Sequence, residues 1–382
     1  EILIGSRSAG IYSDSNTFLN NYGIISSQVS DSVGMYSKVS IGILNDTNGL
    51  INLSGDNSIG LYNLSGANLE NKGTIIIGDS VSQTDPGMGI YSSGNINNTG
   101  IINTGVNSVG IYGYNGVLLQ DGSISTGNNS IGIYADQETV TISALSTINV
   151  GDTSTGVYGK NGTDIVNNGN MNIGTKSYGY ILNSNSKLLN NSAIQLSDDS
   201  VAFYSDAALS IINSSGANLS MSGSNNIGFY MINGGSLENN ADISGDLGLS
   251  NIGMHNNGGT IKNTGDIKLG DSVLLYKNDG EINYNTSKFS IGIYGENNTS
   301  FENTGNIELG ADSVGIYIKD YKGSAAAKNS GNITVNKNGG IGLFAENSVL
   351  KNSGVITMNG DNAIGMGANI NATIINEGTI TM

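Results

Sequence analysis

The sequence predicts an all-β protein, a right-handed parallel β-helix of about 16 coils of about 24 residues each. Three observations predict this fold: a five-residue element recurs along the chain, short segments alternate apolar with polar or small residues, and glycine is very frequent. Alternation of this kind has the period of a β-strand. The 57 glycines argue against helices, because each glycine inside a helix costs about 1 kcal/mol.

The recurring element reads Ser or Asn, apolar, Gly, apolar, Tyr. Gly holds the middle position except in two copies, where Ala202 and Leu274 replace it. From Tyr12 to Gly367 the 16 copies span 355 residues, so that the 15 intervals average about 24 residues. The last positions of the copies are Tyr12, Tyr36, Tyr62, Tyr91, Tyr112, Tyr134, Tyr158, Ile181, Tyr204, Tyr230, His255, Tyr276, Tyr294, Tyr317, Phe344 and Gly367.

Stacking of these coils buries one face of every strand. The second and fourth positions of the element are nearly always apolar, so we expect them to form the core, with Ile59, Ile131 and Ile291 buried. The glycine and the tyrosine then lie on the outer face, where the glycine leaves room for a neighbouring ring. The tyrosines are expected to form an outward ladder that includes Tyr112, Tyr134, Tyr294 and Tyr317; a partly buried corner is the alternative.

A second element, Asn-x-Gly-x-Ile-x-apolar, comes before the next copy of the first. A buried Asn amide can bond its own turn and the Asn of the next coil, so a structural Asn ladder is expected. Leucine-rich repeats place Asn after the strand and left-handed β-helices use hexapeptides, and neither pattern fits here. The ladder residues are Asn71, Asn98, Asn263, Asn303, Asn329 and Asn352.

Composition excludes several functions. The chain has 31 acidic and 15 basic residues, and this net charge of −16 disfavours nucleic acid as a partner. There is no cysteine, so disulfides and thiolate chemistry are excluded. No apolar run approaches 18 residues, so we expect no direct membrane insertion of these residues.

Catalysis is not expected, and neither is a metal or another cofactor. The turn before the Tyr strand carries either Asp or Asn, and a position that accepts both is typical of a turn former that bonds its own backbone. His255 is the single histidine and occupies a Tyr position. Calcium between stacked Asp turns is an open alternative, although the nonapeptide array typical of it is absent. The turn aspartates are Asp79, Asp152, Asp199, Asp271, Asp312 and Asp361.

Recognition is expected where the repeat is stretched, because extra residues of a solenoid form loops. The coils that end at Tyr91 and Phe344 are 29 and 27 residues long, which predicts protruding loops near residues 80–87 and 319–330. No linker or change of composition divides the chain, so residues 1–382 are expected to form one domain, an excerpt of a longer array. The candidate binding residues are Thr84, Asp85, Pro86, Lys319, Tyr321, Lys322 and Lys328.

Repeats of S-x-G-I-Y that alternate with N-x-G-x-I-x-[VIL]-G resemble passenger segments of large Gram-negative autotransporter adhesins, those of fusobacterial type in particular. The resemblance implies an adhesive or structural rod at the bacterial cell surface, tethered through an outer-membrane barrel outside these residues. Its partners would be a host-cell receptor, a glycan or a surface protein of another microbe, and its native oligomeric state is open. A carbohydrate-active β-helix enzyme (polysaccharide lyase or hydrolase) and a pure spacer stalk are the alternatives.

Overall fold

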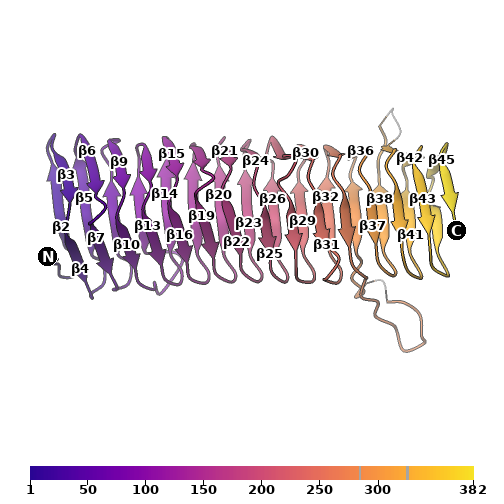
Figure 1. Cartoon of the computed structure of the whole chain (residues 1–382), viewed down its shortest axis with the longest axis horizontal. Helices are drawn as coiled ribbons and strands as arrows, with labels where there is room; N and C mark the ends of the chain where they lie inside the picture. Colours follow the sequence, from indigo (N-terminus) through magenta and orange to yellow (C-terminus); the bar gives the residue numbers. More distant parts are fainter. Residues whose placement is uncertain (284, 324–326) are drawn as a thin grey trace. The chain divides into compact units, whose positions relative to one another are not determined.

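The protein is built from stacked coils. The computed structural model describes residues 1–283, 285–323 and 327–382. It confirms the predicted all-β solenoid of about 16 coils, whose strands alternate between three parallel sheets, here named A, B and C (Figure 1). The described residues contain no helix that could cross a membrane. The right-handed winding stays a prediction.

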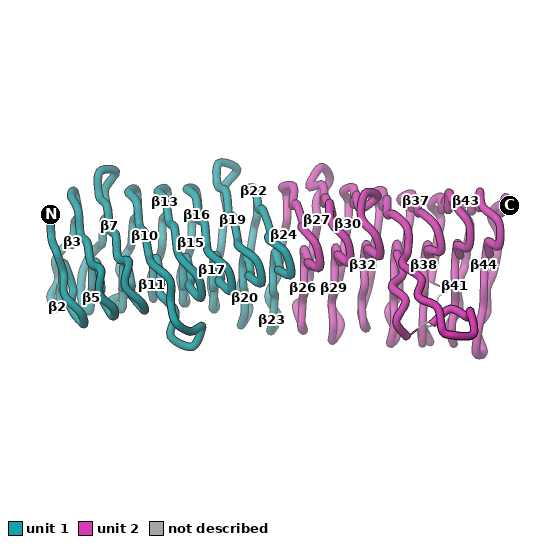
Figure 2. The backbone as a smooth tube through the Cα atoms, turned by 90° about the horizontal axis from the view of Figure 1, so that it is seen from below, with its two compact units in different colours: residues 1–188 teal, residues 189–382 magenta. Residues whose placement is uncertain are grey.

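Contacts within the chain divide it into two compact units, residues 1–188 and 189–382 (Figure 2). The boundary falls inside strand β24 (Lys187–Asn190). Each unit is described by itself below, and the expectation of a single domain stays a prediction.

Unit 1 contains the first strands of all three sheets. Sheet A has β1 (Ile2–Leu3), β4 (Ile24–Ser27), β7 (Leu50–Leu53), β10 (Thr74–Ile77), β13 (Ile101–Thr104), β16 (Ser123–Thr126), β19 (Thr147–Val150) and β22 (Asn170–Ile173). Sheet B has β2 (Ala9–Asp14), β5 (Val33–Val39), β8 (Ile59–Asn63), β11 (Met88–Ser92), β14 (Val109–Tyr114), β17 (Ile131–Asp136), β20 (Thr155–Lys160) and β23 (Tyr178–Asn183). Sheet C has β3 (Phe18–Asn21), β6 (Gly42–Asn45), β9 (Asn68–Asn71), β12 (Ile96–Asn98), β15 (Val117–Gln120), β18 (Thr139–Ile142) and β21 (Asp164–Asn167).

Unit 2 repeats this order. Sheet A has β25 (Ile194–Leu196), β28 (Leu219–Met221), β31 (Ile243–Gly245), β34 (Ile267–Leu269), β37 (Ile307–Leu309), β40 (Ile333–Val335), β43 (Val355–Met358) and β46 (Thr379–Thr381). Sheet B has β26 (Val201–Asp206), β29 (Ile227–Ile232), β32 (Ile252–Asn257), β35 (Ile291–Glu296), β38 (Val314–Lys319), β41 (Ile341–Glu346) and β44 (Ile364–Asn369). Sheet C has β27 (Ser210–Asn213), β30 (Ser236–Asn239), β33 (Thr260–Asn263), β36 (Ser300–Asn303), β39 (Ala327–Asn329), β42 (Val349–Asn352) and β45 (Thr373–Asn376).

The core is a continuous set of aliphatic side chains inside each unit. Equivalent positions of neighbouring coils pair directly, so that Ile75 of β10 lies beside Ile102 of β13 and Ile111 of β14 lies beside Ile133 of β17. All four of these side chains are fully buried. A coil alone would expose this apolar surface, and stacking removes it from water.

Sheet B departs from strict alternation at the repeated glycine, and one expectation about its faces is therefore wrong. The glycine and the residue after it both point inward, as the consecutive buried positions of β14 and β17 show. The second position of the element consequently faces outward, and Ile59, Ile131 and Ile291 are only half-buried. A β-strand that places two successive residues on one face contains a local irregularity of the kind seen in β-bulges.

The repeated glycine is required by close approach. A Cβ atom added to Gly110 would lie 2.5 Å from the carbonyl oxygen of Gly132 and 2.8 Å from Cγ2 of Ile124. The glycine therefore faces the core and the next coil, not a ring on the outer surface as the sequence suggested. A side chain at this position would overlap backbone atoms that have no space to move.

The asparagine positions form the expected kind of column. Asn263 is fully buried, and its Nδ2 donates to Asn303 Oδ1 of the next coil at 2.8 Å and to Gly265 O of its own turn at 2.8 Å. Both donors of the amide are thereby satisfied away from water. Side-chain bonds along the column join Asn71 to Asn98 and Gln120 in unit 1, and Asn190, Asn213, Asn239, Asn263, Asn303, Asn329, Asn352 and Asn376 in unit 2.

The tyrosines stack on the outer face of sheet B. The rings of Tyr112 and Tyr134 have centroids 4.6 Å apart and planes at 10°, and those of Tyr294 and Tyr317 are 5.0 Å apart at 16°. His255 takes its place in the column between Tyr230 and Tyr294, at 4.8 and 4.5 Å. Each stacked ring covers the face of its neighbour, and the column is half-buried.

One predicted coil does not exist. Tyr276 was expected to end a coil of its own, but residues 271–283 and 285–290 lie between β34 and β35, where antiparallel bridges of Val273 with Lys288 and of Tyr276 with Ile282 form a hairpin (Figure 1). Tyr276 is 63% exposed there, and His255 pairs directly with Tyr294 in sheet B. Leu274 stands at the position where sheet B brings glycine against the next coil, and a side chain as large as leucine would overlap that backbone.

Candidate recognition surfaces

The loop predicted near residues 80–87 is a strap that leaves unit 1 between β10 and β11 (Figure 2). Thr84 and Asp85 are exposed and Pro86 is half-buried. Three bonds fix the strap: Gly87 N donates to Ser80 Oγ at 2.6 Å, Asn57 Nδ2 donates to Asp85 Oδ2 at 3.1 Å, and Gln83 Nε2 donates to the Asn129 carbonyl at 2.6 Å. The last bond reaches across neighbouring coils, so the strap is held against sheet B.

A groove of about 360 Å³ lies beside this strap. Gln83 and Pro86 form one wall, the outward side chains of Val109 and Ile131 lie on its floor, and Tyr158 with Ile181 closes one end. The polar rim comes from turn residues in successive coils, namely Asn107, Asn129 and Thr153. All three have positive φ, between 54° and 56°, which Asn tolerates better than most residues.

The second predicted loop, residues 319–330, does not gather its candidate residues at one place. Lys319 ends β38 and forms an ion pair with Glu346 at 3.4 Å, whereas Lys328 lies in β39 of another sheet. Tyr321 is only 8% exposed, with its ring close to Gly323 of the same loop, and its backbone N–H donates to Ser348 Oγ at 2.9 Å. Lys322 is exposed, and residues 324–326 of the predicted loop lie outside the described residues.

The hairpin of residues 271–290 is the excursion that the sequence prediction missed. Val273 and Lys288 exchange backbone bonds of 2.8 and 2.9 Å, and Lys288 Nζ donates to Asn225 Oδ1 of the solenoid at 3.1 Å. Leu275 and Tyr276 project with 48% and 63% of their surface exposed. The signal that could have found it is the Asn-Asp-Gly turn at 278–280 between two apolar stretches, a common hairpin pattern.

An acidic groove of about 310 Å³ lies on sheet A of unit 2. Asp242 and Asp266 lie in adjacent coils, where Asp266 N donates to Asp242 Oδ1 at 3.2 Å. Lys268 and Glu308 are paired neighbours on the strands beside them, and Lys268 also forms an ion pair with Asp246 at 3.1 Å. Carboxylates in adjacent coils with a cation nearby are the arrangement expected of the enzyme alternative, at positions that the sequence did not single out.

The predicted turn aspartates serve the stacking of coils. Asp199 and Asp312 have positive φ of 55°, a turn conformation that Asp and Asn both adopt. Other members bond a neighbouring coil, which corrects the expectation of a bond to their own backbone. Their carboxylates accept the backbone N–H of the following coil: Asp79 from Val106, Asp152 from Thr175 and Asp271 from Ala311, each at 2.8 Å, while the N–H of Asp361 donates to Asn338 Oδ1 at 3.0 Å.

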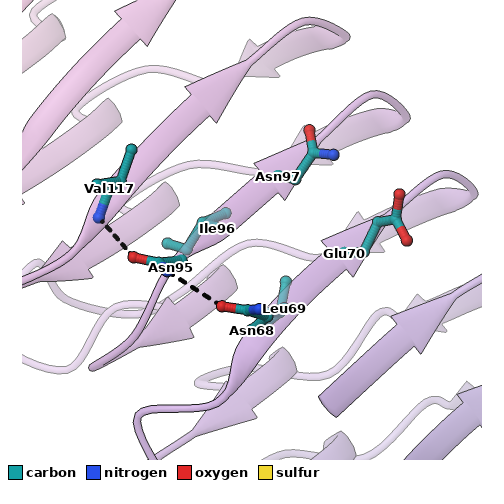
Figure 3. A pocket seen from close by; sticks show the side chains of 7 residues that line it. All are labelled: Asn68, Leu69, Glu70, Asn95, Ile96, Asn97 and Val117. Carbon is teal, nitrogen blue, oxygen red and sulfur yellow. Dashed lines mark hydrogen bonds between the residues drawn. The ribbon is translucent and has the colours of Figure 1, made fainter.

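Sheet C of unit 1 carries a further hollow of about 540 Å³ (Figure 3). Asn95 lies at its centre, donates to Asn68 Oδ1 at 3.1 Å and accepts the N–H of Val117 at 3.0 Å. Glu70 is the one carboxylate among its lining residues and is paired with Lys72 at 3.1 Å. The hollow thus lacks paired acids in adjacent coils among the described residues.

Glu138 and His255 are among the groups whose pKa values are shifted by burial. Burial raises the pKa of the Glu138 carboxyl to about 7, and the nearby charge of Asp136 adds to the rise. Burial lowers the pKa of His255 despite a 3.1 Å contact between its Nε2 and Glu296 Oε1. His255 lies in the ring column on the outer face of sheet B, whereas Glu138 is buried in the turn after β17.

The sequence was compared with known families and proteins. A family model described as the BigA third pectate lyase-like domain matches residues 1–150 and, in a second match, residues 118–382. No curated protein and no solved structure matches the chain.

Proposed function

Because the chain belongs to the family described as the BigA third pectate lyase-like domain, we propose that it is an adhesive, non-catalytic scaffold at a bacterial surface. The family description names a fold, and fold alone does not fix activity. The fusobacterial autotransporter resemblance, the attachment to a surface and the lack of turnover are all parts of this proposal. The proposed partners are a host-cell receptor, a glycan or a protein on another microbe.

The observation that carries the proposal is the hairpin of residues 271–290. It presents two neighbouring large apolar side chains, Leu275 and Tyr276, to solvent with 48% and 63% of their surface exposed. Exposed apolar and aromatic side chains on a loop, held by a rigid framework, are typical of protein recognition. Contacts of this kind, repeated on many copies at a cell surface, gain strength by multivalency.

A binding assay tests this function directly. The protein is coupled to beads, and the beads are counted on epithelial cells and on bacteria of other species. We expect attachment of the wild-type protein and a loss of at least ten-fold when Leu275 and Tyr276 are both replaced by Ser. Leu247→Ser is the matched control, because Leu247 is 86% exposed in the same unit but outside the hairpin. No attachment by the wild-type protein favours the spacer hypothesis and contradicts ours.

A polysaccharide lyase or hydrolase is the second candidate, and the acidic groove of unit 2 favours it. Asp242 and Asp266 would act as the acid–base pair or bind the substrate, with Lys268 beside them. Incubation with polygalacturonate and with neutral polysaccharides, with and without calcium, is the test. Release of shortened or unsaturated products that is lost in Asp266→Asn supports the enzyme and overturns the non-catalytic proposal. Unchanged substrate supports the scaffold.

A further inference from the structure

We propose that the groove beside the strap of unit 1 binds an uncharged saccharide. The strap is the segment from Ser80 to Gly87, and the groove is the space between it, Val109, Ile131 and Tyr158. The proposal names a ligand for the adhesive function above and rests on that function.

The groove has one wall that is fixed by hydrogen bonds. The strap is tied down by the bonds of Gln83 to the Asn129 carbonyl and of Asn57 to Asp85, at 2.6 and 3.1 Å. A wall fixed in this way needs little ordering when a ligand binds, which favours affinity. The volume of about 360 Å³ lies within the range of small-molecule sites, about 300–1,000 Å³.

The lining selects against charge. The described residues that line the groove are all uncharged, although the chain as a whole carries a net charge of −16. An anionic uronate would lose hydration without gaining a cationic partner here, and the acidic protein would repel it. Asp85 lies on the strap, but its carboxylate is bonded to Asn57 and it does not line the groove.

The polar groups on the rim match hydroxyl groups. Asn107, Asn129 and Gln83 each carry an amide that both donates and accepts hydrogen bonds. The Oδ1 of Asn107 and the Oε1 of Gln83 accept no hydrogen bond from the described residues, whereas the Nδ2 of Asn107 donates to the Ser80 carbonyl at 2.7 Å. These free acceptors suit the hydroxyl donors of a sugar ring and not a second acceptor such as a carboxylate.

The floor and the end wall match the C–H face of a pyranose. Val109 and Ile131 give a flat aliphatic strip, since both face outward from neighbouring strands of sheet B. Tyr158 stacks on Tyr134 at 5.0 Å and 12°, but on its other side the column has Ile181 in place of a ring. Tyr158 is therefore the one ladder tyrosine that lines this groove, with a side not covered by another aromatic ring.

A glycan panel tests the proposal. Neutral oligosaccharides that contain glucose, galactose, mannose or N-acetylhexosamine are compared with oligogalacturonates and sialylated glycans. We expect wild-type protein to bind one or more neutral members, Tyr158→Leu to bind at least ten-fold more weakly, and Gln83→Ala to bind several-fold more weakly. Tyr112→Leu is the matched control, because Tyr112 stacks in the same column but does not line the groove. Equal losses in the two Leu variants would mean that only ladder stability changed, which overturns the proposal.

The remaining outcomes separate this site from the general function. Binding only of acidic glycans, or of an uncharged peptide in place of sugars, overturns the saccharide assignment. If cells still attach and attachment is unaffected by Tyr158→Leu and by free neutral sugar, the adhesive function stands and the groove proposal fails. If neutral sugars bind with the expected dependence on Tyr158 while no cell attaches, the groove proposal stands and adhesion fails.

Discussion

Glu138 gives unit 1 a stability that depends on pH. The residue follows β17 and is only 2% exposed. Its Oε2 accepts the N–H of Gly116 at 2.7 Å, whereas its Oε1 has no hydrogen-bond partner among the described residues. Gly113 leaves the space that the carboxyl fills, since a Cβ added there would lie 2.9 Å from Oε1. The perturbation we consider is Glu138→Gln, which keeps the shape and removes the charge.

The size of the effect follows from the pKa. Burial raises the pKa of Glu138 from 4.5 to about 7. Each unit corresponds to about 1.4 kcal/mol, so a carboxyl completely shielded from water contributes about 3 kcal/mol, and solvent screening reduces this to about 2 kcal/mol. The pKa is higher in the folded state, so the stabilisation is fully present below 4.5 and is lost as pH rises through about 7.

Hydrogen exchange is the suitable assay, because solenoids unfold in parts and a single unfolding free energy is ill-defined. Protection of the segment 113–120, which contains the Gly116 amide, is measured at about pH 5 and about pH 8 and corrected for the intrinsic exchange rate. We expect the opening free energy in the wild type to fall by about 2 kcal/mol over this range and in Glu138→Gln to change by less than about 0.5 kcal/mol.

Glu70→Gln is the matched control, since the Glu70 side chain is 37% exposed and paired with Lys72. We expect this variant to keep the pH dependence of the wild type. An equal pH dependence in wild type and Glu138→Gln would refute the reasoning, because the titrating group would then be another one.

Three further predictions concern the outer face and core of sheet B. Ile111→Ala should lower the opening free energy of the surrounding strands, measured by hydrogen exchange, by about 2–5 kcal/mol, and Ile131→Ala by about 1 kcal/mol or less, because only Ile111 is fully buried. Equal losses would restore the face assignment expected from the sequence. Gly110→Ala should destabilise the protein by about 1–3 kcal/mol in the same measurement. Gly23→Ala is the control: no atom lies within 4 Å of a Cβ added there, so its stability should change by less than about 0.5 kcal/mol. Burial lowers the pKa of His255 below 6.5, so the stabilisation from its neutral form is present above that value and is lost as pH falls through the lowered pKa. His255→Phe should abolish this acid sensitivity in thermal melts, and an unchanged pH profile would contradict the prediction.

The architecture could be predicted from the sequence because its cause is local and repeated. Alternation in each segment gives strands, and the recurrence of the same letters gives the register that pairs Tyr112 with Tyr134. The asparagine column was also predictable, since burial of an amide such as that of Asn263 is tolerated only when neighbouring groups form its hydrogen bonds. These inferences need no knowledge of distant contacts.

The faces of sheet B could not be predicted by the same rule. Strict alternation assigns the second and fourth positions to one face, but the glycine of the element and the residue after it both turn inward, and Ile131 is moved to the surface. Only the contact between Gly132 and the next coil makes this visible: a Cβ there would lie 2.6 Å from the Gly156 carbonyl. Such backbone contact across coils leaves no mark in the alternation pattern.

The recognition surfaces were harder to predict than the scaffold. The extended coil predicts Tyr321 as a binding residue, but loop length does not determine which side chains stay exposed, and Tyr321 is 8% exposed. The five residues that end at Tyr276 resemble the repeat and predict a coil, whereas the structure forms a hairpin there. Asp242 and Asp266 occupy a variable position of the Asn element, which holds Thr74 in another coil, so no pattern distinguished them.

The amide column has a direction, and this has a consequence for how such chains change length. Every side-chain bond from Asn190 to Asn376 runs the same way, with Nδ2 donating to the coil that follows. Duplication or loss of a whole coil therefore joins coil surfaces that already fit. Insertion or deletion of a few residues within a strand instead leaves side-chain amides without partners on both sides of the change. This geometry permits divergence by gain or loss of whole coils, with extra residues tolerated only in the turns between strands.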